Sequence, residues 1–138
     1  MTNSRNKGAS FEREVANLLN SDLGLSNSIK RILEQTREKH LPDLILGKWY
    51  IECKRYGDGA EPLEAWWQQV LESSKDKGIP ALVYKFNRRP IKVKIPLGAI
   101  NPALPLSSPF TADLLWGDFI FLLKELYQDD LDTHDLEN

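Results

Sequence analysis

The sequence contains little cysteine and histidine, with one cysteine and two histidines in 138 residues. A single cysteine excludes a disulfide bond within the chain, and such scarcity is typical of proteins from reducing compartments. Structural zinc sites draw most of their ligands from these two residue types, so we expect no such site here.

Long hydrophobic segments are missing as well. No apolar run comes near the ~20 residues that a helix needs to cross a bilayer, and no basic and then apolar leader opens the chain. We therefore expect no membrane association and no secretion, but a cytoplasmic protein, in the host cytoplasm if the source is a virus. A length of 138 residues suits one domain with one hydrophobic core.

Positive charge is scarce in the last part of the chain. Residues 101–138 contain one lysine and eight acidic residues, whereas residues 1–100 contain 17 lysines and arginines against 12 acidic residues. The net charge of −2 therefore conceals a basic body of +5 and an acidic end of −7. The basic body suits a polyanionic partner, and we expect the acidic tail, residues 129–138, to be disordered.

Hydrophobic periodicity predicts three helices and five short strands. The predicted helices are residues 7–24, 62–78 and 110–128, and the predicted strands are residues 26–33, 41–46, 48–54, 81–86 and 91–95. A helix inserted between strands of one small sheet indicates an α/β domain with a mixed five-stranded β-sheet flanked by helices. The last helix is rich in apolar residues, so it either lies in the core or packs on a second copy of the chain.

Charged residues interrupt the strands at 41–46 and 48–54, namely Asp43, Glu52 and Lys54. Gly47 and the residue after it predict a tight turn, so the two strands form a hairpin and Asp43 can lie near Glu52. Strand side chains alternate between faces, which places Glu52 and Lys54 on the same face.

This trio has the chemistry of a metal site that hydrolyses phosphodiesters. Two adjacent carboxylates repel each other, and Mg²⁺ removes that repulsion because it prefers hard oxygen ligands. Such a cation activates water, and Lys54 can stabilise the attacking water or the developing phosphate charge. The backbone carbonyl of Cys53 is a further candidate ligand. The alternative is a solvated hairpin edge, at which Lys54 pairs weakly with an acid.

Glu12 is a candidate third acid. It lies three residues before Val15 and seven before Leu19 on the first predicted helix, so it borders the apolar face and can look over the sheet edge. The alternative is an ordinary surface glutamate beside Arg13.

Four segments of the chain resemble the archaeal-type Holliday junction resolvases of the PD-(D/E)XK nuclease superfamily. They are, in order, KGASFEREV, LPDLIL, IECK and KGIPALVYKF, within about residues 5–95. The resemblance implies a restriction-endonuclease-like fold in one nuclease domain, residues 1–128, with a core at about 5–95 and a C-terminal helix at about 110–128.

The resemblance also implies an activity. It implies that the catalytic residues are Glu12, Asp43, Glu52 and Lys54, and that the three acids bind Mg²⁺ or Mn²⁺. It also implies that the protein is a homodimeric endonuclease. Its substrate is a four-way DNA junction, cut in two opposed strands during DNA recombination and repair.

Some nucleases of the superfamily also place a glutamine on the helix after the lysine. In the predicted helix at residues 62–78, Gln68 and Gln69 flank the apolar face about equally.

Contacts to a branched DNA are expected to involve phosphates more than bases. The candidate residues are Arg5, Lys7, Lys30, Arg31, Arg37, Lys39, Arg55, Arg88 and Arg89. Two other functions remain open, a restriction-like or repair nuclease of the same superfamily and an inactive nuclease fold that only binds DNA.

Overall fold

The structure, a computed structural model, describes residues 4–32 and 41–137, with side chains from residue 8 onward. The helices are α1 (Ser4–Leu23), α2 (Glu64–Ser74), α3 (Trp116–Leu126) and α4 (Gln128–Leu136), with a short 3-10 helix η2 (Leu97–Ala99). The strands are β1 (Leu44–Leu46), β2 (Trp49–Arg55), β3 (Ile79–Lys85), β4 (Lys92–Pro96) and β5 (Thr111–Leu115). No helix in the described ranges has the length and apolar character of a membrane span.

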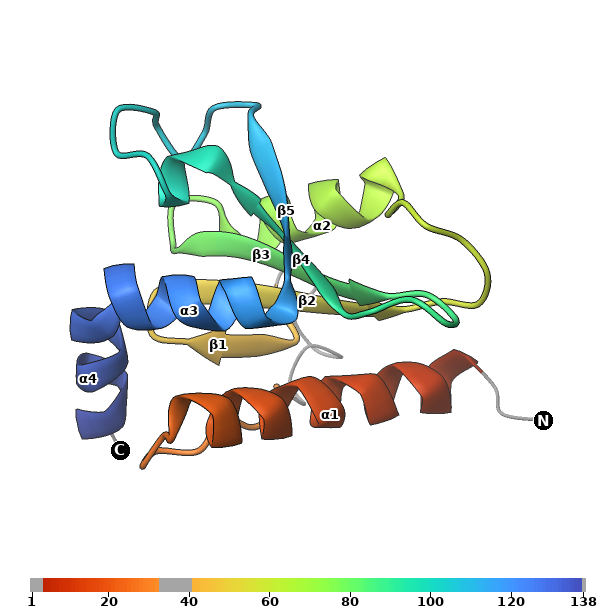
Figure 1. Cartoon of the computed structure of the whole chain (residues 1–138), viewed down its shortest axis with the longest axis horizontal. Helices are drawn as coiled ribbons and strands as arrows, with labels where there is room; N and C mark the ends of the chain where they lie inside the picture. The colour runs from red at the N-terminus through yellow and green to blue at the C-terminus, as the bar shows by residue number, and fades with distance from the viewer. Residues whose placement is uncertain (1–3, 33–40, 138) are drawn as a thin grey trace.

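The five strands form one mixed sheet in the order β1-β2-β3-β4-β5 (Figure 1). The pair β2 and β3 is parallel because α2 carries the chain back between them, and the other neighbours are antiparallel. The predicted class, an α/β fold with a mixed five-stranded sheet flanked by helices, is confirmed.

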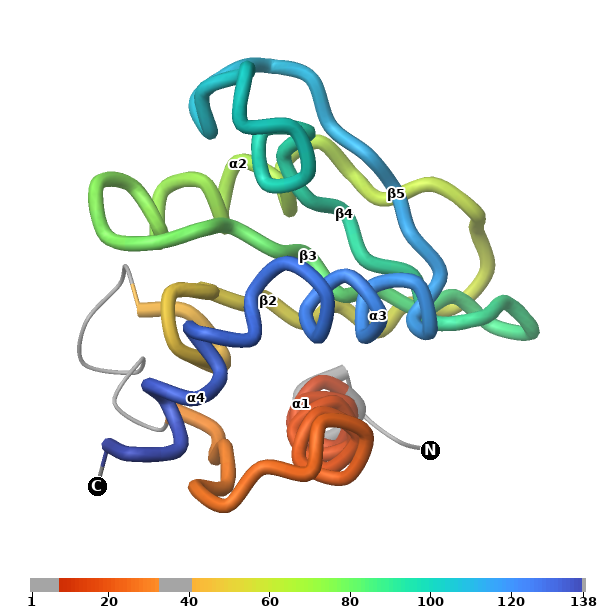
Figure 2. The backbone as a smooth tube through the Cα atoms, turned by 60° about the vertical axis from the view of Figure 1, so that its left-hand side comes forward, coloured from red at the N-terminus to blue at the C-terminus, as the bar shows by residue number. Residues whose placement is uncertain are grey.

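Helices cover both faces of the sheet. On one face, α1 and α3 pack on the alternate residues Trp49, Ile51 and Val83 in the main core. On the other face, Trp67 and Val70 of α2 pack with the intervening residues of β3 in a smaller cluster. Figure 2 shows α1 and α3 together on one side of the strands. Glu52 and Lys54 alternate with the main-core residues, so they belong to the α2 face.

The prediction for the strands was wrong at two places. The described part of residues 26–33 contains no strand, because Ile29 bonds to the Asn20 side chain and Ile32 to the Asp43 carbonyl rather than to a ladder. Residues 110–128 contain both β5 and α3 instead of one helix. The β5 segment pairs with β4 and places Ala112 and Leu114 toward the core, which a helix starting there would not allow.

The tail is a helix, α4, rather than the disordered segment that its acidic composition predicted. Leu131 and His134 are buried. The Asp130 carboxylate accepts the Lys48 backbone N–H at 3.0 Å. Gly47 has a positive φ of 56°, and a Cβ there would lie 2.4 Å from Asp130 Oδ2, so glycine permits this close contact. The Asp130 side chain therefore holds the turn of the β1–β2 hairpin.

Leu131→Ala should lower the free energy of unfolding by about 2–4 kcal/mol, because it removes a side chain that is 3% exposed at this contact. Urea denaturation measures the change. The matched control is Leu136→Ala on the same helix, whose side chain is 83% exposed and should change stability little. Equal effects of the two variants would contradict the docking of α4.

Candidate active site

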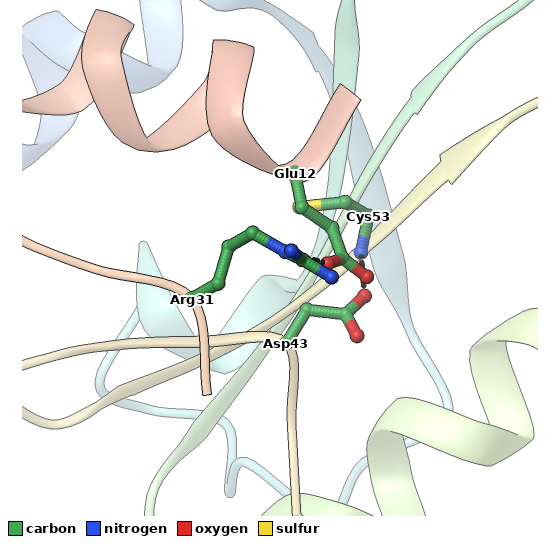
Figure 3. Close-up of polar contacts among 4 residues, drawn as sticks. All are labelled: Glu12, Arg31, Asp43 and Cys53. Carbon is green, nitrogen blue, oxygen red and sulfur yellow. Dashed lines mark hydrogen bonds and ion pairs between the residues drawn. The ribbon is translucent and has the colours of Figure 1, made fainter. Parts of the chain in front are cut away.

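Asp43 lies immediately before β1, at the open end of the hairpin. Leu44 pairs with Ile51, so Asp43 comes opposite Glu52 when the register continues. The Asp43 side chain is buried, and its Oδ2 accepts a hydrogen bond from the Cys53 backbone N–H at 2.8 Å. This bond orients the Asp43 carboxylate beside β2, as Figure 3 shows.

Glu12 reaches the same place from α1. The helix is anchored in the core by Phe11 and Val15, and Glu12 itself is buried at the border of that core. Figure 3 shows the carboxylates of Glu12 and Asp43 pointing toward one another. Arg31 Nε lies 2.5 Å from Glu12 Oε2 and forms an ion pair with it.

Glu52 is the third acid and the most deeply buried, with 1% of its surface exposed. From α2, Gln69 Nε2 donates a hydrogen bond to Glu52 Oε2 at 3.2 Å. Gln68 instead donates to Glu64 on its own helix at 2.8 Å. The position of α2 on the sheet thus distinguishes two glutamines that the sequence pattern left equivalent.

Burial and repulsion between the acids raise the pKa values of Glu12 and Glu52. Burial is the largest cause for Glu52, the charge of Asp43 is the second, and together they raise the pKa of Glu52 to about 9 although Lys54 opposes the shift. Burial and Asp43 also raise the pKa of Glu12, against the opposing effect of Arg31. Glu52 therefore retains its proton at neutral pH in this arrangement, and such perturbed acids are typical of functional sites.

Residues 3–107 match the model of a protein family described as "Phage putative PDDEXK endonuclease". The chain belongs to this PD-(D/E)XK endonuclease family. The matched range contains α1, the hairpin, α2, β3 and β4, and hence Glu12, Asp43 and Glu52. The predicted superfamily is thereby confirmed, and it implies binding to DNA. No curated protein and no solved structure matches the chain.

The acids of this endonuclease fit a divalent cation by their chemistry. Carboxylate oxygens are hard ligands, and neighbouring carboxylates gain most from a cation between them. Glu12, Asp43 and Glu52 would hold it, together with the carbonyl of Cys53, because the N–H and C=O of one strand residue project to the same edge. Among the described residues, no three His, Cys, Asp or Glu side chains have the spacing of a preformed metal site. Arg31 forms an ion pair with Glu12, and Gln69 donates a hydrogen bond to Glu52.

The basic residues predicted to contact DNA occupy different settings in the endonuclease. Three are exposed and available to phosphates, namely Lys30, Arg88 and Arg89. Four lie outside the described residues or side chains, namely Arg5, Lys7, Arg37 and Lys39.

Two of the predicted DNA contacts are engaged within the protein. Arg55 Nη2 donates to Asn87 Oδ1 at 2.9 Å, and its Nη1 donates to the Tyr56 carbonyl, so Arg55 ties the end of β2 to the turn after β3. Arg31 contacts Glu12 in the acidic centre, the group formed by Glu12, Asp43 and Glu52. The sequence did not reveal these partners, because it does not distinguish an arginine that pairs within the fold from one on the surface.

Gln69→Leu should lower the rate of DNA cleavage roughly tenfold, because Glu52 loses a hydrogen-bond donor. Single-turnover kinetics with saturating enzyme measure this rate. The matched control is Gln68→Leu, one residue earlier on α2, which should leave the rate within about twofold because its amide contacts Glu64. Equal losses in both variants would contradict a specific role of Gln69.

Proposed function

We propose that this chain is a Mg²⁺- or Mn²⁺-dependent, structure-selective endodeoxyribonuclease, and specifically a homodimeric Holliday junction resolvase. The observation that carries the proposal is that three buried carboxylates from three separate segments, α1, the residue before β1, and β2, lie near enough for their charges to repel one another. Membership in a PD-(D/E)XK endonuclease family supports nuclease chemistry. The resemblance to archaeal-type resolvases supports the finer choice of substrate.

In this proposal, each residue of the candidate site has one role. Asp43, Glu52 and Glu12 hold the cation, which when bound lowers the pKa of a coordinated water and neutralises charge on the scissile phosphate. Lys54 projects from β2 on the same face as Glu52 and orients the attacking water or stabilises the pentacovalent phosphate. Gln69 positions Glu52 from the other side.

Cuts in two opposed strands of a junction require two active sites, so the proposal includes a dimer. The helix α3 buries Phe119 and Leu123 inside the chain. Phe121 and Leu126 on the same helix remain 65% and 57% exposed. These two side chains support packing against a second copy. Sedimentation equilibrium tests this part, and a monomer at micromolar concentration would contradict it.

Substrate choice is tested by incubating the protein with a four-way junction, a flap and a linear duplex of equal length. Each DNA is tested with Mg²⁺, with Mn²⁺ and with EDTA. We expect paired nicks in opposed strands of the junction, little cleavage of the duplex, and no cleavage in EDTA. Cleavage of the flap or duplex at an equal rate would replace the resolvase by a repair or restriction-like nuclease. Binding of DNA without cleavage under any condition would indicate an inactive nuclease fold.

A further inference from the structure

Arg31 lies inside the acidic centre rather than on the surrounding surface. Its Nε is 2.5 Å from Glu12 Oε2, and the side chains of the pair are 27% and 12% exposed respectively. Hydrogen bonds between two charged groups are among the strongest in proteins, and a partly buried pair is screened less than a surface pair. The guanidinium therefore supplies positive charge beside Glu12, whose carboxylate points toward that of Asp43 (Figure 3).

The backbone on both sides of Arg31 is fixed. Ile29 donates its backbone N–H to Asn20 Oδ1 at 2.7 Å, and the Asn20 amide returns a bond to the Ile29 carbonyl. On the other side, the Ile32 N–H donates to the Asp43 carbonyl at 3.0 Å. The Cα of Arg31 thus stays beside Asp43, whereas its partly exposed side chain has solvent into which it can turn.

We propose that Arg31 is a built-in counter-ion of the metal-free site, which holds Glu12 until a divalent cation displaces the guanidinium. A cation bound by Glu12 would lie against a second positive charge on the same carboxylate, and like charges at that separation repel strongly. Cation binding and the Arg31–Glu12 contact are therefore competing states. Arg31 is a positioning residue that sets the cation concentration at which the site fills. The inference rests on the proposed function, since it requires that the acids bind a divalent cation.

The first test measures Mn²⁺ binding to the full chain without DNA, by isothermal titration calorimetry. Arg31→Gln removes the competing charge and should bind Mn²⁺ roughly three to ten times more tightly than the wild type. The matched control is Lys30→Gln, which removes the same charge from the adjacent exposed residue and should change the affinity by less than about twofold. Unchanged or weaker binding by Arg31→Gln would overturn the inference, as would an equal gain in both variants.

A second measurement uses the wild type alone and does not depend on the folding of a variant. In metal-free protein, the Arg31 Nε–H should give a protected signal in ¹H–¹⁵N spectra because it donates to Glu12. Saturating Mg²⁺ should abolish that protection by releasing the side chain. If the wild type binds the cation while the Arg31 signal stays protected, the inference fails and the proposed function stands. If neither the wild type nor Arg31→Gln binds Mn²⁺ or Mg²⁺, both fail.

Discussion

Asp43→Asn should lower the rate of DNA cleavage about a thousandfold, since in the proposed function Asp43 holds the cation and its loss removes several kcal/mol of transition-state stabilisation. Asp43 is the acid that the other two share, because its charge raises the pKa of both Glu12 and Glu52. Asparagine keeps an oxygen that can accept the Cys53 N–H, so the hairpin should remain folded. The substitution thus separates the charge of Asp43 from its structural hydrogen bond.

Single-turnover cleavage of the preferred DNA measures this effect, with a gel-shift assay in EDTA to confirm that DNA is still bound. The matched control is Asp129→Asn, an exposed aspartate in the first turn of α4, which should cleave at the wild-type rate. A variant Asp43→Asn that retains more than about a tenth of the activity would show that this carboxylate does not hold the catalytic metal. Loss of DNA binding together with cleavage would point to a folding defect instead.

The β1–β2 hairpin could be predicted from the sequence because its determinants are local. Alternating apolar residues define the faces of the two strands, and Gly47 defines the turn between them. The opposition of Asp43 and Glu52 follows from that register, which the structure confirms for the strand residues themselves. Periodicity made Glu12 a candidate third acid only by placing it at the border of an apolar face, and the resemblance to known nucleases favoured this interpretation over that of a surface glutamate.

Partners distant in the chain could not be predicted in this way. Arg31 and Glu12 are 19 positions apart, and nothing in the sequence distinguishes an arginine in an acidic centre from one on a DNA-binding surface.

The contacts of the acidic tail were equally unpredictable. The Asp135 carboxylate accepts the backbone N–H groups of Ser26 and Asn27, more than 100 positions away. An acidic residue that predicts disorder by composition thus makes specific hydrogen bonds in the folded chain.

The stability of the metal-free protein should decrease as pH rises from about 5 to 9, and Glu52→Gln should remove most of this decrease. An unfolded glutamate titrates near pH 4.3, whereas the folded protein holds the pKa of Glu52 at about 9. Between these values the folded state binds the additional proton. The stabilising contribution is therefore complete below the unfolded pKa and is lost by up to about 1.4 kcal/mol for each pH unit above it.

Urea denaturation in EDTA at several pH values measures this loss, and at pH 8 the Glu52→Gln variant should be more stable than the wild type by up to roughly 5 kcal/mol. The matched control, Glu125→Gln, changes an exposed glutamate of α3 and should follow the wild-type curve. Parallel curves for the wild type and Glu52→Gln would contradict the raised pKa of Glu52. Adding Mn²⁺ at pH 8 should stabilise the wild type far more than the glutamine variant. In the wild type, a cation bound to the folded state replaces the proton that Glu52 loses, whereas the variant has no carboxylate at this position to bind the cation.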